Sequence, residues 1–433
     1  MTDRAAASLE ALLVRFGEAV DANAVAVLWD GRRVPLGRRR PDAEPLTIRF
    51  NDRGAISYFV RRPSLDRLFE VVALGGVEIE GMSPLDATTH WQHLRVVDFA
   101  RKTGIAGFVR ALWPFLAHGK DGKGQRSLAF GGGDDAAQVR HHYDVSNAFY
   151  RLFLDERMVY SCGYFEREDA TLDEAQRAKL DIACRKLRLR EGARLLDIGC
   201  GWGGLAIHAA RHHGAHVLGI TLAEEQMGLA KERVAREGLQ DRIDIRLADW
   251  RDLSEREAFD GVVQIGMYEH VGLADQAPFF GAVHRFLKPD GVYLHHAIVK
   301  RHKRSRKGRS AYQKVIDRFI FPGTELDHIG ETLTKIEHAG LEPHDTENWR
   351  WHYAKTCRLW SERLHQRRAE ATEIVGADVC RMWLLYLAMV TIGFERANIG
   401  IHQTVCTRRG HGAPPVPLTR ADIYRSRDDD GVS

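Results

Sequence analysis

The sequence predicts an α/β fold, in which a parallel, Rossmann-like sheet is covered by helices and preceded by a small α+β domain. Strand and helix patterns alternate from residue 173 to residue 296, as is typical of parallel sheets. A glycine-rich turn over 199–204 follows an apolar run, as at the first crossover of a nucleotide-binding sheet. Residues 1–117 lack this alternation and show short strand and helix patterns instead. These observations separate the two predicted domains.

Length and composition set the outer limits. The chain has 433 residues and a net charge of +4, which allows two or three domains and gives no general electrostatic case for nucleic acid binding. Its six cysteines include no C-x-x-C pair, so we expect no metal site, no disulfide framework, and reduced thiols in a cytoplasmic protein. Charged residues interrupt the first ten positions, so no signal peptide is expected. The longest uncharged apolar run, 382–394, is too short to span a bilayer, and any membrane contact is expected to be peripheral.

The N-terminal domain is predicted over 1–117. A helix is expected over 5–20, where apolar residues recur on one face. Asp30-Gly31 predicts a turn between strands 25–29 and 34–36, and Pro35 places the second of these at a sheet edge. A second hairpin is expected from strands 46–50 and 56–60, followed by a helix that begins after Ser64.

The N-terminal domain carries no obvious catalytic cluster. We interpret it mainly as a docking or scaffold domain, with lipid or partner binding as the alternative. Residues 118–139 are rich in glycine and poor in apolar side chains, so we expect a flexible linker, which could become ordered over a ligand. The catalytic domain is then predicted over 140–433.

The second domain carries the alternating pattern. Strands are expected at 195–198, 217–221, 243–247, 259–265 and 292–296, with helices at 173–189, 205–213, 223–237 and 276–287. Ligands of such sheets bind at the carboxyl ends of the strands. The residues at these ends therefore predict a pocket, and they are Asp197, Thr221, Asp249, Trp250, Glu269 and His296.

The glycine-rich turn indicates a cofactor. Its D-x-G-x-G-x-G spacing, beginning at Asp197, favours S-adenosylmethionine over a dinucleotide, although a plain tight turn is the alternative. No carboxylate follows the second strand to hold ribose hydroxyls, so Thr221 and Gln226 are candidates for that task. Asp249 can accept a hydrogen bond from an adenine amino group, and Trp250 either stacks on the ring or packs in the core.

Two further pairs of residues at the strand ends are candidate site residues, namely Glu269-His270 and His295-His296. Glu269 lies at the mouth of a buried strand, where a carboxylate needs partners or its pKa rises, so a functional role is favoured over a surface charge. His270 is interpreted as a residue that caps or orients its neighbours. Strand alternation sends His295 and His296 to opposite faces, so at most one of them faces a ligand.

A run of basic residues extends over 300–309. Its plain interpretation is a solvated loop, and the alternative is attraction to an anionic surface, at roughly 1 kcal/mol per basic residue near anionic lipid. Nucleic acid binding is disfavoured because no aromatic residues are interleaved with the charges. The aromatic residues of the C-terminal third are expected to pack mostly in a core, with some lining a long apolar substrate.

Taken together, these motifs resemble the cyclopropane-fatty-acyl-phospholipid synthase family, which includes the mycolic acid cyclopropane synthases. The resemblance extends over residues 140 to about 410, and more weakly over the N-terminal domain. The motifs that carry it are His142-Tyr143-Asp144, Phe149-Tyr150, Tyr160-Ser161-Cys162, Leu195 to Gly204, Glu269-His270-Val271-Gly272 and Phe319-Ile320-Phe321-Pro322-Gly323. The resemblance implies a class I methyltransferase sheet with helical insertions over an acyl pocket.

The resemblance also implies two sets of site residues. The S-adenosylmethionine site corresponds to Tyr160, Ser161, Asp197, Gly199, Cys200, Gly201, Gly203, Thr221, Leu222, Gln226, Asp249 and Trp250. A bicarbonate ion is implied at the positions that match Cys162, Glu269, His296, Ile298 and Tyr353. Two departures from the family pattern are His295, where an apolar residue is more usual, and the length of the basic run 300–309.

The implied activity is methylene transfer from S-adenosylmethionine to a cis double bond of phospholipid acyl chains, giving a cyclopropane ring. The resemblance implies a cytoplasmic enzyme peripheral to the inner face of the membrane, and a homodimer is left open. One alternative is a methyl- or methylene-branched product from the same cation, and another is a methyltransferase for a soluble small molecule. A nucleic acid methyltransferase and a lipid-binding protein without catalysis are further, weaker alternatives.

Overall fold

The computed structural model describes residues 3–20, 22–39, 45–90, 112–116, 146–301, 311–320 and 323–424. It divides into two compact units that do not follow the chain order. The first unit consists of the described residues within Met1–Phe130, Lys307–Ile320 and Ser361–Met389. The second unit consists of those within Gly131–Arg306, Phe321–Trp360 and Val390–Ser433. The predicted linker 118–139 and nearly all of the basic run 300–309 lie outside the described residues.

The first unit contains a four-stranded sheet in the order β2-β1-β3-β4. Its strands are β1 (Ala24–Val27), β2 (Arg33–Pro35), β3 (Leu46–Phe50) and β4 (Val77–Glu80). β1 pairs antiparallel with β2 and parallel with β3. The first predicted hairpin is therefore confirmed, and Pro35 lies in an edge strand, where its missing N–H removes no ladder bond.

The second predicted hairpin is wrong. Residues 56–60 belong to helix α2 (Arg53–Arg61), and β3 pairs instead with β4 in antiparallel register. Asp52 begins the helix because its carboxylate accepts hydrogen bonds from the backbone N–H groups of Gly54 and Ala55, at 2.8 and 3.0 Å. The segment that resembles a hairpin turn is thus a helix cap. The predicted N-terminal helix and the helix after Ser64 are confirmed as α1 (Arg4–Val20) and α3 (Leu65–Ala73).

Later segments of the chain complete the first unit. Helix α13 (Ala311–Phe319) packs on α3, where the rings of Phe319 and Phe69 stack with centroids 5.1 Å apart. Arg318 donates to the buried Glu70 carboxylate at 3.0 Å. Arg381, which also belongs to this unit, donates to the carbonyl of Ala73 at 2.9 Å. The remaining helices that contribute are α4 (Pro84–His90), α16 (Arg368–Val375) and parts of α15 (Arg350–Gln366) and α17 (Ala377–Glu395).

The second unit is built on a seven-stranded mixed sheet in the order β10-β11-β9-β8-β5-β6-β7. Its strands are β5 (Arg194–Ile198), β6 (His216–Thr221), β7 (Ile243–Leu247), β8 (Phe259–Ile265), β9 (Leu287–Lys300), β10 (Leu341–Asn348) and β11 (Ile399–Arg408). The five predicted strands are confirmed, and they pair in parallel. The last two strands were not predicted, and both pair antiparallel.

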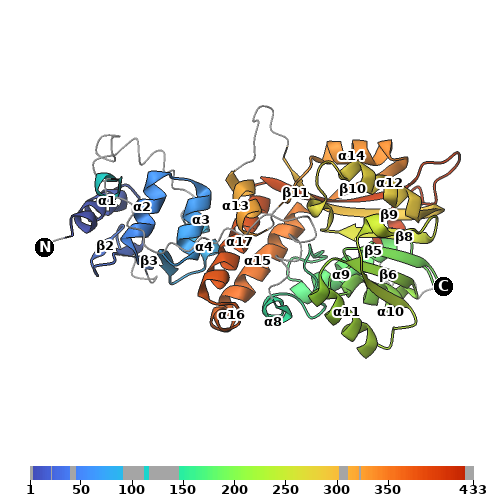
Figure 1. The fold of residues 1–433 in the computed structure, drawn as a ribbon, viewed down its shortest axis with the longest axis horizontal. Helices are drawn as coiled ribbons and strands as arrows, with labels where there is room; N and C mark the ends of the chain where they lie inside the picture. Colours follow the sequence, from blue (N-terminus) through green and yellow to red (C-terminus); the bar gives the residue numbers. More distant parts are fainter. Residues whose placement is uncertain are drawn as a thin grey trace. The chain divides into compact units, whose positions relative to one another are not determined.

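Helices cover both faces of this sheet (Figure 1). One face packs against α9 (Leu172–Lys186), α10 (Gly204–His213) and α11 (Glu224–Arg236). The other packs against α12 (Gln276–Phe286) and α14 (Ile329–His338). Each face buries its own apolar cluster, so the strands between them are apolar on both sides, as parallel sheets require. This arrangement fixes the carboxyl ends of the five parallel strands along one edge.

Helix α17 contains the apolar run 382–394 and extends beyond it. Among the described residues it is the one helix long and apolar enough, by length and composition, to cross a membrane. However, 72% of that window is buried inside the protein, which is also the pattern of a helix in a soluble core. Its composition therefore indicates a core helix at least as well as a membrane span.

Candidate active site

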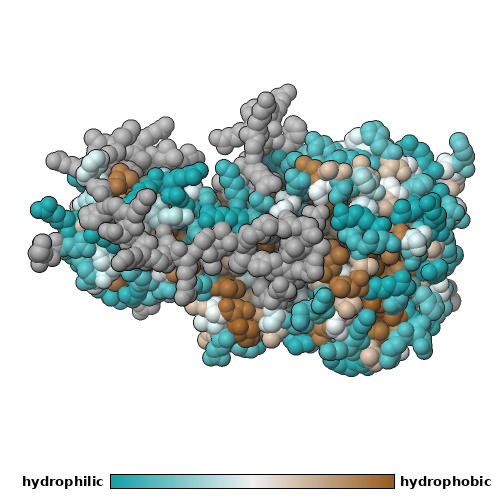
Figure 2. Space-filling view, in the orientation of Figure 1, coloured by the Kyte–Doolittle hydropathy of each residue, from teal (hydrophilic) through white to brown (hydrophobic). Residues whose placement is uncertain are grey.

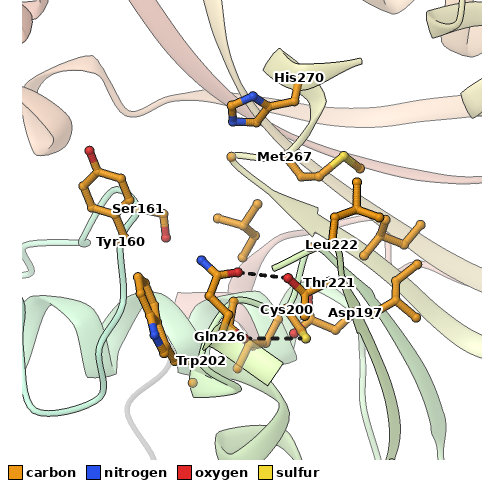
Figure 3. Close-up of a pocket in the computed structure, with 18 of the residues that line it drawn as sticks. Tyr160, Ser161, Asp197, Cys200, Trp202, Thr221, Leu222, Gln226, Met267 and His270 are labelled. Atoms are coloured by element: carbon orange, nitrogen blue, oxygen red, sulfur yellow. Dashed lines mark hydrogen bonds between the residues drawn. The ribbon is translucent and has the colours of Figure 1, made fainter. Parts of the chain in front are cut away.

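A pocket opens at the carboxyl ends of the parallel strands, as the strand order predicts (Figure 3). Most of the predicted cofactor residues line it, namely Tyr160, Ser161, Asp197, Gly199, Cys200, Gly201, Thr221, Leu222, Gln226, Asp249 and Trp250. The remaining one, Gly203, is the N-cap of α10 at the rim of the same turn. Trp202, within the predicted glycine-rich motif, also lines the pocket, and so do Lys179 and Met267, which sequence reasoning did not assign to the cofactor.

The glycine turn has the backbone that a close ligand approach needs. Gly199, Gly201 and Gly203 have φ of 79°, 54° and 76°, a region that residues with a Cβ rarely adopt. At Gly199 a Cβ would lie 2.8 Å from the Cβ of Met267, so a larger residue would displace the pocket wall. The turn leads directly into α10, whose first N–H groups are free of helical partners.

Thr221 and Gln226 lie together at the end of β6. Both are buried, and the Thr221 hydroxyl donates to the Gln226 side-chain oxygen at 2.9 Å (Figure 3). The Thr221 oxygen also accepts from the backbone N–H of Ala223, at 3.3 Å. This pair offers an amide and a hydroxyl to the pocket in place of the usual carboxylate, as the sequence suggested.

Asp249 and Trp250 follow β7. The Asp249 carboxylate accepts from the backbone N–H of Arg251 at 2.8 Å and from its guanidinium at 2.9 Å. Trp250 is only 9% exposed, and its ring meets that of Phe279 edge-on, with centroids 5.3 Å apart. Trp250 therefore both packs in the core and lines the pocket, so the two interpretations offered by the sequence are compatible.

A buried cation and a buried acid share the back of the pocket. Lys179 of α9 is 1% exposed, and its ammonium donates to the Ser161 hydroxyl at 2.9 Å. Burial lowers the pKa of Lys179 to about 8. Burial likewise raises the pKa of Asp197 to about 7, and the charge of Lys179 opposes that rise. One oxygen of Asp197 has no hydrogen-bond partner among the described residues, so it is available to a ligand.

Within the second unit, a row of aromatic side chains extends away from the pocket. Tyr160, a pocket residue, lies 5.1 Å from Trp360 between ring centroids, and Trp360 lies 6.0 Å from Tyr353. Tyr353 in turn packs against Phe394 at 4.6 Å. The predicted ion-binding residue Tyr353 is thus connected to the pocket by a continuous aromatic wall.

Glu269 and Ile298, two of the predicted bicarbonate residues, are in direct contact. Glu269 is 5% exposed, and its Oε1 accepts from the backbone N–H of Ile298 at 2.6 Å. Its Oε2 is buried without a hydrogen-bond partner among the described residues. Burial raises the pKa of Glu269 to about 7, and the hydrogen bond from Ile298 opposes this.

His296 and Cys162 meet around Trp349. The fully buried His296 ring shares a hydrogen bond with the Gln403 amide at 3.0 Å and meets the Trp349 ring edge-on at 5.1 Å. Its Nε2 has no hydrogen-bond partner among the described residues. Cys162 is buried, and its Sγ lies 3.9 Å from the Trp349 carbonyl. Burial raises the pKa of Cys162 well above the usual range and lowers that of His296 well below it.

The two neighbouring histidines point to opposite faces, as strand alternation predicts. His295 is held by Gln264 and by the Tyr293 hydroxyl, both at 2.9 Å, in the aromatic core under α12. His296 and Ile298 are two residues apart on β9, so their side chains share the other face, about 7 Å apart along the strand. Of the two histidines, His296 is the one on the side of Cys162 and Trp349.

The predicted ion-binding residues lie next to the pocket. Cys162 follows the pocket residue Ser161, and Glu269 comes two residues after Met267. The backbone N–H of Gly266, another pocket residue, donates to the His296 carbonyl at 2.9 Å. The structure therefore places the buried, unpartnered atoms of Glu269 and His296 at the same edge of the sheet as the cofactor pocket.

The fold and the pocket together define a class I S-adenosylmethionine-dependent methyltransferase. The mixed seven-stranded sheet, the glycine turn and the residues at the strand ends are those of that class. Comparison with known proteins narrows this further. Residues 133–404 match the family described as mycolic acid cyclopropane synthetase, and the chain belongs to that family.

Two relatives that cover most of the chain have names that refer to fatty acids. A probable fatty acid methyltransferase of Pseudomonas putida is 38% identical over 92% of this chain and 95% of its own length. Tuberculostearic acid methyltransferase UfaA1 of Mycobacterium tuberculosis is 34% identical over 88% of this chain and 85% of its own length. Among solved structures, mycolic acid cyclopropane synthase CmaA1 complexed with SAH and CTAB has a TM-score of 0.60 and 35% identity, over 63% of this chain and 98% of the other. The chain is therefore an S-adenosylmethionine-dependent methyltransferase of the fatty acid methyltransferase and cyclopropane synthase family.

Proposed function

We propose that this enzyme transfers a methylene group from S-adenosylmethionine to a cis double bond of phospholipid acyl chains, forming a cyclopropane ring with the help of a bound bicarbonate. The observation that carries the proposal is the pair of buried atoms without partners, Glu269 Oε2 and His296 Nε2, beside the cofactor pocket. A buried polar atom normally has a hydrogen-bond partner, so each of these two atoms favours a small polar ligand beside it.

The donor and acceptor types suit bicarbonate. At neutral pH the low pKa of His296 leaves its ring neutral, and Gln403 holds the other ring nitrogen. The raised pKa of Glu269, about 7, lets it exist in either protonation state, so it can donate to or accept from the ion. Bicarbonate, when bound, would supply the base that removes a proton from the alkylated chain. The protein's part is to fix its oxygens through Glu269, His296 and Tyr353.

The aromatic wall suits a reaction that passes through a cation. An isolated double bond is a poor nucleophile, so the pocket must align it closely with the cofactor methyl group. Methyl transfer leaves positive charge on the acyl chain, and the faces of Tyr160, Trp360 and Tyr353 can stabilise it. The same rings keep water away, which would otherwise trap the cation as an alcohol.

A lipid substrate is supported by the exposed apolar side chains of the second unit. Trp351 is 64% exposed and Leu273 is 44% exposed. Figure 2 shows hydrophobic side chains gathered on the visible face of this unit, within a surface that is otherwise largely hydrophilic. We propose accordingly that the protein works at the inner face of the cytoplasmic membrane as a peripheral enzyme.

The direct test is acyl-chain analysis. Purified protein is incubated with S-adenosylmethionine and liposomes of unsaturated phospholipid, and the chains are compared by chromatography and mass spectrometry with cyclopropane standards. A cyclopropane chain is the expected product. An unchanged acyl chain from folded, cofactor-binding protein would overturn the proposal and favour a soluble substrate.

The role of Glu269 is tested by Glu269→Gln. We expect turnover to fall by roughly 100-fold or more, as for loss of an acid–base function, with little change in S-adenosylmethionine affinity. Activity of the unaltered enzyme should also fall in bicarbonate-depleted buffer and recover on addition of bicarbonate, whereas the variant should not recover. Glu325→Gln is the matched control, because the Glu325 carboxylate nearby already has a partner in the backbone N–H of Leu273, at 2.8 Å.

A branched product is the second candidate. The relatives that match most of this chain are named fatty acid and tuberculostearic acid methyltransferases, which favours methyl or methylene branches. The same cation gives a methylene branch if hydride shift precedes loss of a different proton, and a saturated methyl branch requires an added reductant. Chromatography of the products separates the branched chains from the ring, although all gain one carbon.

A further inference from the structure

A second cluster of ligand-type side chains lies away from the cofactor pocket, between α9 and α10. Helix α9 contributes Asp181 and Cys184, and α10 contributes His208 and His213. One donor atom from each of Cys184, His208 and His213 lies within 4.8 Å of the other two. None of the four side chains lines the cofactor pocket, and the proposed reaction uses none of them.

Two distances within the cluster, both from Asp181, are those between ligands of one metal ion. Asp181 Oδ1 lies 3.4 Å from His213 Nε2 and 3.6 Å from His208 Nε2. A charge-assisted hydrogen bond would bring such atoms to about 2.7–2.9 Å. Around a tetrahedral zinc ion with bonds of about 2.0–2.3 Å, neighbouring ligand atoms lie about 3.3–3.7 Å apart. Both carboxylate–imidazole separations fall in the second range.

Burial supports the same conclusion independently. His208 is 7% exposed, and its Nε2 has no hydrogen-bond partner among the described residues. Cys184 is fully buried. A buried imidazole nitrogen this close to a thiol and a carboxylate favours a ligand shared among them, because a buried polar atom normally has a partner.

The surroundings of Asp181 resemble a metal ligand's second shell. Its other oxygen, Oδ2, pairs with the Arg185 guanidinium at 2.5 Å, one turn further along α9. Arg185 is itself fixed by the carbonyl of Ile423 at 3.2 Å. Such a partner orients a ligating carboxylate and holds its second oxygen away from the metal.

We propose that Asp181, Cys184, His208 and His213 form a tetrahedral site for a divalent transition metal ion. One thiolate, two imidazoles and one carboxylate favour Zn²⁺ over Mg²⁺ or Ca²⁺, which take oxygen ligands. The ion replaces the thiol proton of Cys184, which passes to solvent. Four protein ligands leave no open position, so the site is structural and not catalytic.

The site would brace the scaffold of the cofactor pocket. Helix α9 also carries Lys179 and Gln176, which hold the hydroxyl and the carbonyl of Ser161 at 2.9 and 2.8 Å. Helix α10 begins in the glycine turn. A metal that joins the two helices would therefore stabilise the pocket without touching the cofactor. No local sequence pattern indicates this site, because its ligands come from two helices and include a single cysteine.

The test is metal binding by the full-length protein. After dialysis against a chelator, Co²⁺ is added, because tetrahedral Co²⁺ with a thiolate ligand gives intense visible absorption and a thiolate charge-transfer band. We expect about one equivalent to bind, Zn²⁺ to displace it, and either metal to raise Tm. Absence of a saturable charge-transfer band in the folded, unaltered protein would overturn the proposal.

Two variants locate the ligands. His213→Asn removes a ligand that lies at the last residue of α10, where the fold is least disturbed, and Cys184→Ala removes the thiolate. Both should lose stoichiometric binding, with at least a 100-fold weaker affinity, as loss of a ligand implies. His216→Asn, at an exposed histidine on β6, is the control and should bind as the unaltered protein does. Equal Co²⁺ binding by His213→Asn and the unaltered protein would place the metal elsewhere and reject this site.

Discussion

Asp197 lines the cofactor pocket and has an oxygen without a hydrogen-bond partner among the described residues, so we expect its ionisation to affect cofactor binding directly. Its pKa of about 7 means that near neutral pH the carboxyl is only partly ionised, because burial disfavours its charge. A cationic cofactor attracts the ionised form, so binding lowers this pKa and releases a proton. We expect S-adenosylmethionine affinity, measured by calorimetry, to rise by up to about tenfold per pH unit between pH 6 and 7 and to level off above pH 8. Asp197→Asn should bind more weakly and lose this pH dependence, and an unchanged slope would contradict the assignment.

Lys179 sets where that titration occurs. Its ammonium is the one charge that lowers the pKa of Asp197 against the effect of burial. Lys179→Met should therefore move the midpoint of the pH dependence of cofactor binding to higher pH. Ser161→Ala is the matched control, because it removes the hydrogen-bond partner of Lys179 but leaves the charge. A midpoint that stays in place in Lys179→Met would mean that the two groups are not coupled.

The sequence located the acid but not the lysine, and the reason is physical. Asp197 ends a strand, and strand ends at one edge of a parallel sheet must form the pocket. Lys179 lies on a helix whose pattern gives no sign that a charged residue is buried. Its burial depends on Ser161 and Asp197, which reach it only through the tertiary fold, so no local pattern could reveal it.

At the level of secondary-structure elements, two helices of the first unit have contrasting N-caps. Asp52 accepts two backbone hydrogen bonds at the start of α2, whereas Ser64 makes no side-chain capping bond to α3. Asp52→Ala should destabilise α2 by about 1 kcal/mol, and Ser64→Ala should affect α3 by much less. Hydrogen–deuterium exchange of peptides over 53–61 and 65–73 measures each helix separately. If Asp52→Ala accelerates exchange in α2 no more than Ser64→Ala accelerates it in α3, the side-chain caps do not account for the stability of these helices.

The elements that sequence patterns missed share a cause. Strands β10 and β11 carry many polar residues, and β10 is mostly half-buried, so they lack the apolar pattern that identified the central strands. They are strands because β11 pairs with β9 and β10 pairs in turn with β11. The opposite error occurred at residues 56–60, which were predicted as a strand and are part of a helix. Their composition favours a strand, but the Asp52 cap and the burial of Ala55 and Ile56 favour the helix.

On the scale of the whole chain, the boundaries of the family match differ from those of the two compact units. The family region, 133–404, includes most of the second unit and segments that belong to the first. The relatives that match most of the chain extend through the N-terminal region, whereas the solved mycolic acid cyclopropane synthase covers 63% of it. The N-terminal sheet is thus an addition to the shared methyltransferase, and we propose that it contributes to engaging the membrane or to pairing of two copies.

On the scale of the whole molecule, we propose that the basic run 300–309 attracts the protein to an anionic surface. Replacing Lys303, Arg304, Arg306 and Lys307 with serine should weaken retention on anionic liposomes, since each basic residue contributes about 1 kcal/mol near such lipid. Four replacements imply up to roughly a 1,000-fold lower partition coefficient at low ionic strength, and less at physiological salt, because the attraction is screened.

Cosedimentation with liposomes of defined anionic content measures this partition, and binding of S-adenosylmethionine should be unchanged because none of the predicted cofactor residues belongs to the run. A variant with Arg177, Arg190, Lys231 and Arg256 replaced, all of them exposed, loses the same charge from other places and is the control. If the two variants lose retention equally, total charge rather than this segment drives the attraction. If neither does, the apolar surface of the second unit carries membrane binding, and the enzyme would then also bind neutral liposomes.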